Sequence, residues 1–185
     1  MALKQTIYSP YFNITEKLIV YSALDEAADY LRRFYCFSSR EWFNYCYDLK
    51  TELEVCIDRP HGNVFAEVRK YTPALKNSSA FPEERYQICL FDRNILKALW
   101  KQSGLEFYPF MVYILTHELI HVARFCQKLH PFECDEIALE KEEEKVNKLT
   151  HQILTIRKNN TFYKASSMYD KMGRTPLPPR HPILV

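Results

Sequence analysis

Apolar residues recur at helical or strand spacing along much of this chain. Over residues 15–34 they return at steps of three and four, which predicts an amphipathic helix. Its expected inner face comprises Leu18, Tyr21, Leu24, Ala28 and Leu31. Residues 40–54 repeat this spacing after Ser39, a residue type that favours helix N-caps, so a second helix is expected there. Residues 63–72 and 85–91 largely alternate apolar and polar positions, which predicts two half-buried strands.

The second half of the chain is predominantly helical by the same criteria. Asp92 is placed to cap a short helix that runs to Trp100. A longer and mainly apolar helix is expected over 108–129, because Pro131 stops it. Another long helix is expected over 133–158.

Strands followed by a pair of helices are typical of an α+β fold. We expect a single domain over residues 1–185, in which a small mixed sheet packs on the helix over 108–129 and on the helix that follows it. From about residue 173 the chain carries four prolines, which predicts an extended tail.

Three strongly polar residues interrupt the apolar helix over 108–129. His117, Glu118 and His121 form the pattern H-E-x-x-H. Positions i and i+4 share one face of a helix, so the two imidazoles can bind one metal ion. Glu118 is rotated by about 100° from His117, which places it beside the metal as a base for a metal-activated water. Zn²⁺ suits this site because it accepts imidazole and carboxylate ligands and leaves a position open for water.

This helix resembles the active-site helix of the zincin metallopeptidases, in which both histidines bind zinc and the glutamate is the general base. The resemblance implies a zinc-dependent hydrolase of peptide bonds, with a peptide or protein as substrate. It also implies that the strand at Tyr86–Phe91 pairs with an extended substrate. The metzincin subclass is excluded, because Arg124 and Gln127 stand where that subclass has Gly and His.

A third ligand is needed to complete a zinc site. The gluzincin group of zincins takes it from the following helix, often as Glu-x-x-Ala-Asp, and Glu143 to Asn147 resembles that pattern with Val and Asn at its last two positions. By this resemblance Glu143 is the ligand, and Asn147 braces a ligand histidine. Helix phase instead places Glu142 at the centre of the buried stripe, where it needs a cation such as zinc, Arg124 or Lys128. His130 remains a third possibility.

Two other readings of the same pattern stay open. Glu118 to His121 is also an E-x-x-H unit of di-iron carboxylate proteins, although those need a second copy, and this chain has none. A non-catalytic, zincin-like metal-binding module for regulation or interaction is the other alternative. For a catalytic site, an oxyanion donor is sought among His151, Tyr163 and Tyr169.

The composition of the chain bears on its partners and its location in the cell. The chain has 185 residues, 47% of them hydrophobic, and a net charge of +2 with interspersed signs, which favours neither nucleic acid nor a membrane as partner. Its first residues are too polar for a signal peptide, and its six cysteines form no C-x-x-C pair. We therefore expect a cytoplasmic protein with reduced cysteines.

Overall fold

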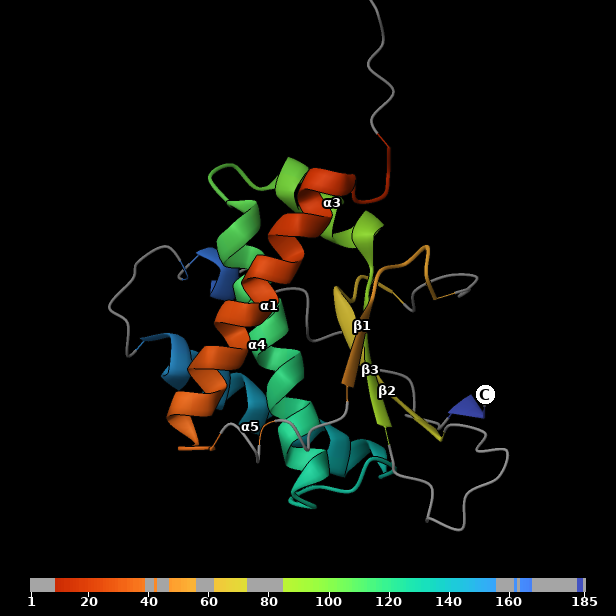
Figure 1. Ribbon diagram of the computed structural model, residues 1–185, viewed down its shortest axis with the longest axis vertical. Coiled ribbons are helices and arrows are strands. Elements are labelled where there is room, and N and C mark those ends of the chain that lie inside the picture. Colours follow the sequence, from red (N-terminus) through yellow and green to blue (C-terminus); the bar gives the residue numbers. More distant parts are fainter. Residues whose placement is uncertain are drawn as a thin grey trace, which may run out of the picture.

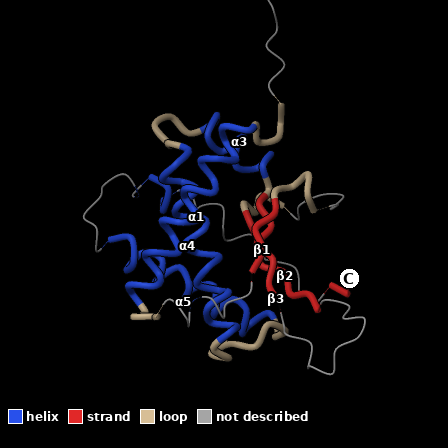
Figure 2. The backbone as a smooth tube through the Cα atoms, viewed as in Figure 1, coloured by secondary structure: helices blue, strands red, loops and turns tan. Residues whose placement is uncertain are grey.

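A computed structural model describes residues 9–38, 42, 47–55, 62–72, 85–155, 162, 164–167 and 183–184. Its helices gather on one side of a small sheet, as Figures 1 and 2 show. One cluster of buried apolar side chains joins the helices to the sheet. The mixture of helices and strands confirms the α+β prediction.

The first helix, α1 (Ile14–Phe34), begins at a capping box formed by Asn13 and Glu16. Its extent confirms the predicted helix, but the predicted inner face is right only for Leu31, which is buried, and for Leu24 and Ala28, which pack partly buried against the core. Leu18 and Tyr21 are 66% and 49% exposed, and the fully buried residues are Val20, Ala23, Ala27 and Leu31. The helix has apolar residues on two adjacent stripes, and the stripe with two alanines packs along α4 (Phe107–Cys126) because small side chains allow close approach.

The helix predicted over 40–54 is wrong over residues 47–54, whereas Trp42, the one described residue before them in this range, is helical. Residues Tyr47–Lys50 form strand β1, which pairs in parallel with β3 (Arg85–Leu90), and a turn follows over 52–55. Residues 39–41 and 43–46 lie outside the described ranges. These four residues form a strand although their apolar spacing is helical, because pairing with a strand distant in sequence outweighs the local preference for a helix.

Two predicted strands are confirmed as β2 (Ala66–Thr72) and β3. They pair antiparallel, and β4 (Ile183–Leu184) pairs in parallel with β2, so the order in the described sheet is β1-β3-β2-β4. The sheet is therefore mixed, as expected. Because β3 is bonded on both edges, the prediction that Tyr86–Phe91 pairs with an extended substrate is wrong. β4 belongs to the proline-rich tail, most of which lies outside the described residues.

Helix α3 (Asp92–Lys101) follows β3 directly, but Asp92 does not cap it as predicted. The N-cap residue is Phe91, and Asp92 lies in the first turn. The carboxylate of Asp92 is fully buried and accepts hydrogen bonds from the backbone N–H groups of Phe12 and Glu52, at 3.1 Å each. Asp92 therefore ties three distant segments together.

Helix α4 is the centre of the core. Every residue from Pro109 to Phe125 is buried, and Phe125 stacks on Tyr86 of β3. The helix ends at Cys126, three residues before the predicted end, where the chain turns through Lys128 with a φ of 55°. Helix α5 (Glu136–Thr155) then packs on α4.

No helix in the described ranges is both long enough and apolar enough to cross a membrane. The cysteines in these ranges form no disulfide with one another: Cys36, Cys89, Cys126 and Cys134.

Candidate metal centre

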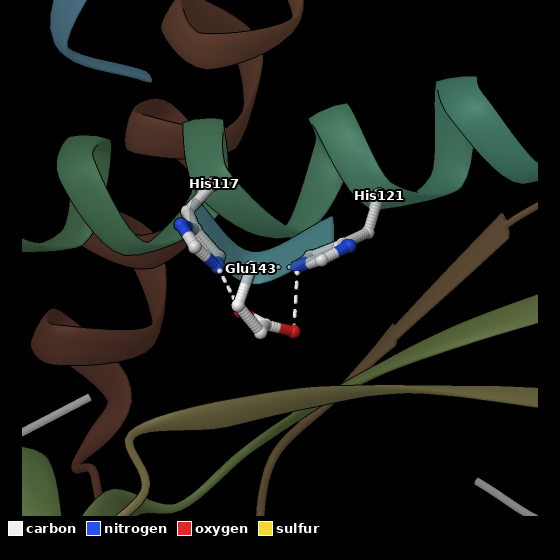
Figure 3. A group of neighbouring side chains, drawn as sticks. All are labelled: His117, His121 and Glu143. Carbon is white, nitrogen blue, oxygen red and sulfur yellow. Dashed lines mark hydrogen bonds and ion pairs between the residues drawn. The ribbon is translucent and has the colours of Figure 1, made fainter. Parts of the chain in front are cut away.

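The structure brings together three of the residues singled out from the sequence. His117 and His121 project from one face of α4 towards the carboxylate of Glu143 on α5 (Figure 3). The two Nε2 atoms are 3.2 Å apart. One oxygen of Glu143 is 3.3 Å from Nε2 of His117, and the other is 3.2 Å from Nε2 of His121. The three side chains thus point at one common position.

These separations fit a tetrahedral zinc site. Zinc lies about 2.0–2.1 Å from imidazole nitrogens and carboxylate oxygens, so neighbouring ligand atoms in a tetrahedron are about 3.3 Å apart. The two nitrogens are 3.2 Å apart, which agrees with that value, and each nitrogen lies 3.2–3.3 Å from a different oxygen of the one Glu143 carboxylate. Among the described residues, His117, His121 and Glu143 form the one group of at least three metal-ligating side chains that lie close enough to share an ion. Three protein ligands leave a fourth position for water or substrate.

The three candidate ligands differ in burial. His117 and His121 are 2% and 1% exposed, whereas the Glu143 side chain is 21% exposed. Burial raises the pKa of Glu143, but the attraction of His121 and the hydrogen bonds from both histidines outweigh it and hold the pKa well below its usual value. The carboxylate is therefore ionised at neutral pH, and solvent reaches the cluster from the side of Glu143.

Glu118 is 3% exposed and lies outside the three-ligand group. Burial raises the pKa of the Cys89 thiol on β3 to about 12, and the charge of Glu118 adds to this rise. Glu118 is thus close enough to β3 for its charge to act there. As the neighbour of His117 on a helix, it is rotated by about 100° from the ligand face.

The two adjacent glutamates of α5 have different partners. Glu142 is buried, as its helix phase predicts, and its cation is Arg124. Nε of Arg124 is 2.5 Å from one carboxylate oxygen, and the guanidinium NH2 is 2.8 Å from the other. The Glu142 carboxylate is therefore paired with Arg124, and the Glu143 carboxylate faces the two histidines. His130 is not a member of the three-ligand group.

Asn147 does not brace a histidine as the resemblance implied. Its Oδ1 atom is buried and has no hydrogen-bond partner in the described part of the chain. Asn147 has an amide in place of the carboxylate of the gluzincin pattern, so it lacks the charge that would hold an imidazole N–H strongly.

His151 contacts a residue that the sequence reasoning missed. Nε2 of His151 is 3.1 Å from the hydroxyl of Tyr113, which is buried on α4. Ser166 Oγ is 3.3 and 3.4 Å from the two ring nitrogens of His151. Tyr113 precedes His117 by four residues, so the spacing of 113, 117 and 121 on one helical face was the available signal. Tyr163 and Tyr169 lie outside the described residues.

Comparison with known proteins finds no matching family model, no similar curated protein and no similar solved structure. The functional proposal therefore rests on the geometry of the site.

Proposed function

We propose that this protein is a zinc-dependent metallohydrolase that cleaves peptide bonds. The observation that carries the proposal is the convergence of His117, His121 and Glu143: the two Nε2 atoms are 3.2 Å apart, and each lies 3.2–3.3 Å from one oxygen of the Glu143 carboxylate. Zinc bound by two imidazoles and a carboxylate would bridge such spacings. Three protein ligands, rather than four, are the number that catalytic zinc sites use.

Zinc bound there would polarise a substrate carbonyl and lower the pKa of water. The chain would supply the proton transfers. Glu118 follows His117 directly and would take a proton from the attacking water, so that the oxygen can form a bond to the carbonyl carbon. The same carboxyl group would return that proton to the leaving amine when the C–N bond breaks, which restores its charge for the next cycle.

A strand other than β3 would have to pair with an extended substrate. β3 is bonded on both sides, whereas β1 is an edge strand of the described sheet. Peptides that add to a sheet do so at an edge, so β1 would be the strand that receives the substrate backbone.

Replacing Glu118 by Gln tests the catalytic role. The amide is nearly isosteric but cannot accept a proton, so the variant should keep zinc and fold while hydrolysis of a peptide library falls at least about a hundredfold. Zinc content, circular dichroism and cleavage by mass spectrometry give the three readouts. If the Glu118→Gln variant cleaves peptides at the wild-type rate, Glu118 is not the catalytic base. A zinc-loaded wild type that cleaves no peptide would instead favour the non-catalytic metal-binding module.

A further inference from the structure

Arg124 and Glu142 form a buried ion pair immediately beside the candidate metal centre. Their side chains are 6% and 2% exposed, and the guanidinium meets the carboxylate in a bidentate contact. Arg124 follows His121 by three residues on α4, and Glu142 precedes Glu143 by one residue on α5. The pair therefore joins the same two helices that supply the three ligand atoms.

Such a pair contributes little stability by itself. Removing two charges from water is unfavourable, their mutual attraction roughly offsets this cost, and a pair of apolar residues of similar volume is often as stable. A bidentate arginine–carboxylate contact is, however, directional, because the planar guanidinium accepts only a narrow range of carboxylate orientations. The pair is thus better suited to fix a geometry than to stabilise the fold.

The geometry that it would fix is the rotation of α5. Successive residues of a helix differ by about 100° around the axis, so a rotation by one position would turn Glu142 or Glu144 towards the histidines in place of Glu143. Holding Glu142 against Arg124 sets the rotation and the register at one end of the cluster. At the other end, Tyr113 and His151 make the 3.1 Å contact between the same helices.

We propose that Arg124 is a positioning residue of the metal centre, which through its bidentate contact with Glu142 holds α5 so that Glu143 faces His117 and His121. This inference rests on the metal-binding part of the proposed function. Arg124 does not itself contact the metal position; it acts through Glu142 and the helix that carries Glu143.

Electrostatics and positioning predict opposite effects when Arg124 is replaced by Met. Loss of a positive charge beside the site, with Glu142 left negative, would strengthen binding of a cation if charge alone mattered. Loss of the bidentate contact frees α5 to rotate and would weaken binding if position matters. Arg124→Met therefore separates the two effects by the direction of the change.

Zinc affinity is the first readout. We expect Arg124→Met to bind Zn²⁺ about tenfold more weakly than wild type, and the Co²⁺-substituted protein to show an altered visible spectrum. Arg124→Lys, which keeps the charge but loses the bidentate geometry, should also bind more weakly than wild type and guards against a Met variant that fails to fold. The matched control is Arg93→Met on α3, which breaks the ion pair between Arg93 and the buried Glu52 and should leave zinc affinity unchanged.

Histidine signals of the metal-free protein are the second readout. Arg124→Met should shift the imidazole ¹⁵N resonances of His117 and His121, because Glu143 leaves its place against them, whereas Arg93→Met should not. Unchanged resonances, or zinc affinity equal to or higher than wild type in the Arg124 variants, would overturn the positioning role. A wild type that binds no zinc would overturn the proposed function instead, and the resonances would still decide the role of Arg124.

Discussion

Glu142 on α5 and Asp92 at the start of α3 are both buried carboxylates, 3% and 0% exposed, yet their pKa values move in opposite directions. Burial raises the pKa of both groups. For Glu142 the hydrogen bonds and charge of Arg124 outweigh burial, so its pKa is lowered. For Asp92 the backbone N–H groups of Phe12 and Glu52 only partly oppose burial, and the charge of Glu52 adds to it, so its pKa is raised.

The difference separates the candidate metal-binding region from a structural tie. Around α4 and α5, buried acids face cations or imidazoles: Glu142 faces Arg124, and Glu143 faces His117 and His121. At α3 the buried acid faces backbone N–H groups from two other segments. Substitutions should accordingly change metal affinity in the first region and folding stability in the second.

The largest expected effect is loss of metal from the first region. Replacing both His117 and His121 by Ala removes two of three ligands, so zinc affinity should fall about a thousandfold or more. Competition with a chromophoric chelator measures it. Asp92→Asn is the comparison variant and should bind zinc as the wild type does. Full zinc content in the double variant would end the distinction between the two regions.

Asp92→Ala should cause the largest loss of stability. It leaves the N–H groups of Phe12 and Glu52 buried without their acceptor, which costs about 1–3 kcal/mol for each group. We expect the free energy of unfolding in urea to fall by about 2–6 kcal/mol. Exposed Lys97→Ala on the same helix provides the control for a general effect of substitution on α3. An unfolding free energy equal to wild type would mean that Asp92 is not a structural tie.

Within the metal centre, Glu143→Ala should weaken zinc binding more than Glu142→Ala, by about tenfold. Glu143→Ala removes a ligand, whereas Glu142→Ala removes the partner of Arg124 and leaves its positive charge beside the site. Isothermal titration of both variants with zinc compares them directly. The reverse order would make Glu142 the ligand.

The smallest expected effect is a change in the pH dependence of stability. Because the pKa of Asp92 is raised in the folded protein, its proton stabilises the fold below about pH 3.8, and this contribution is lost as pH rises through the folded pKa. Asp92→Asn has no carboxyl proton to lose, so it should not show this loss. As pH rises above 3.8, the free energy of unfolding of the wild type should therefore fall relative to that of the variant. Urea unfolding at several pH values measures it, and a constant difference would argue against the raised pKa.

The sequence predicted the helix that carries the candidate ligands because its signals are local. His117 and His121 are four residues apart, which places them on one face of any helix, and the apolar residues that flank the pattern, such as Ile114, Leu115 and Val122, indicate burial. Tyr113 follows the same spacing but was missed, because that spacing alone does not set a tyrosine apart from the other buried residues of an apolar helix. The strand at Tyr47–Lys50 was missed because its pairing partner is distant in sequence.

The sequence by itself determined the H-E-x-x-H helix, the following acidic helix and two of the strands, since each depends on spacing within one segment. The sequence did not decide whether Glu142 or Glu143 is the third ligand. Adjacent residues on one helix differ only in the direction in which they point, and that direction selects a partner only once the neighbouring helix is in place. Tertiary structure decided between their partners by packing α5 so that Arg124 meets Glu142 and both imidazoles meet Glu143. It also placed β3 inside the sheet, because strand order follows from pairings between distant segments rather than from the pattern within any one of them.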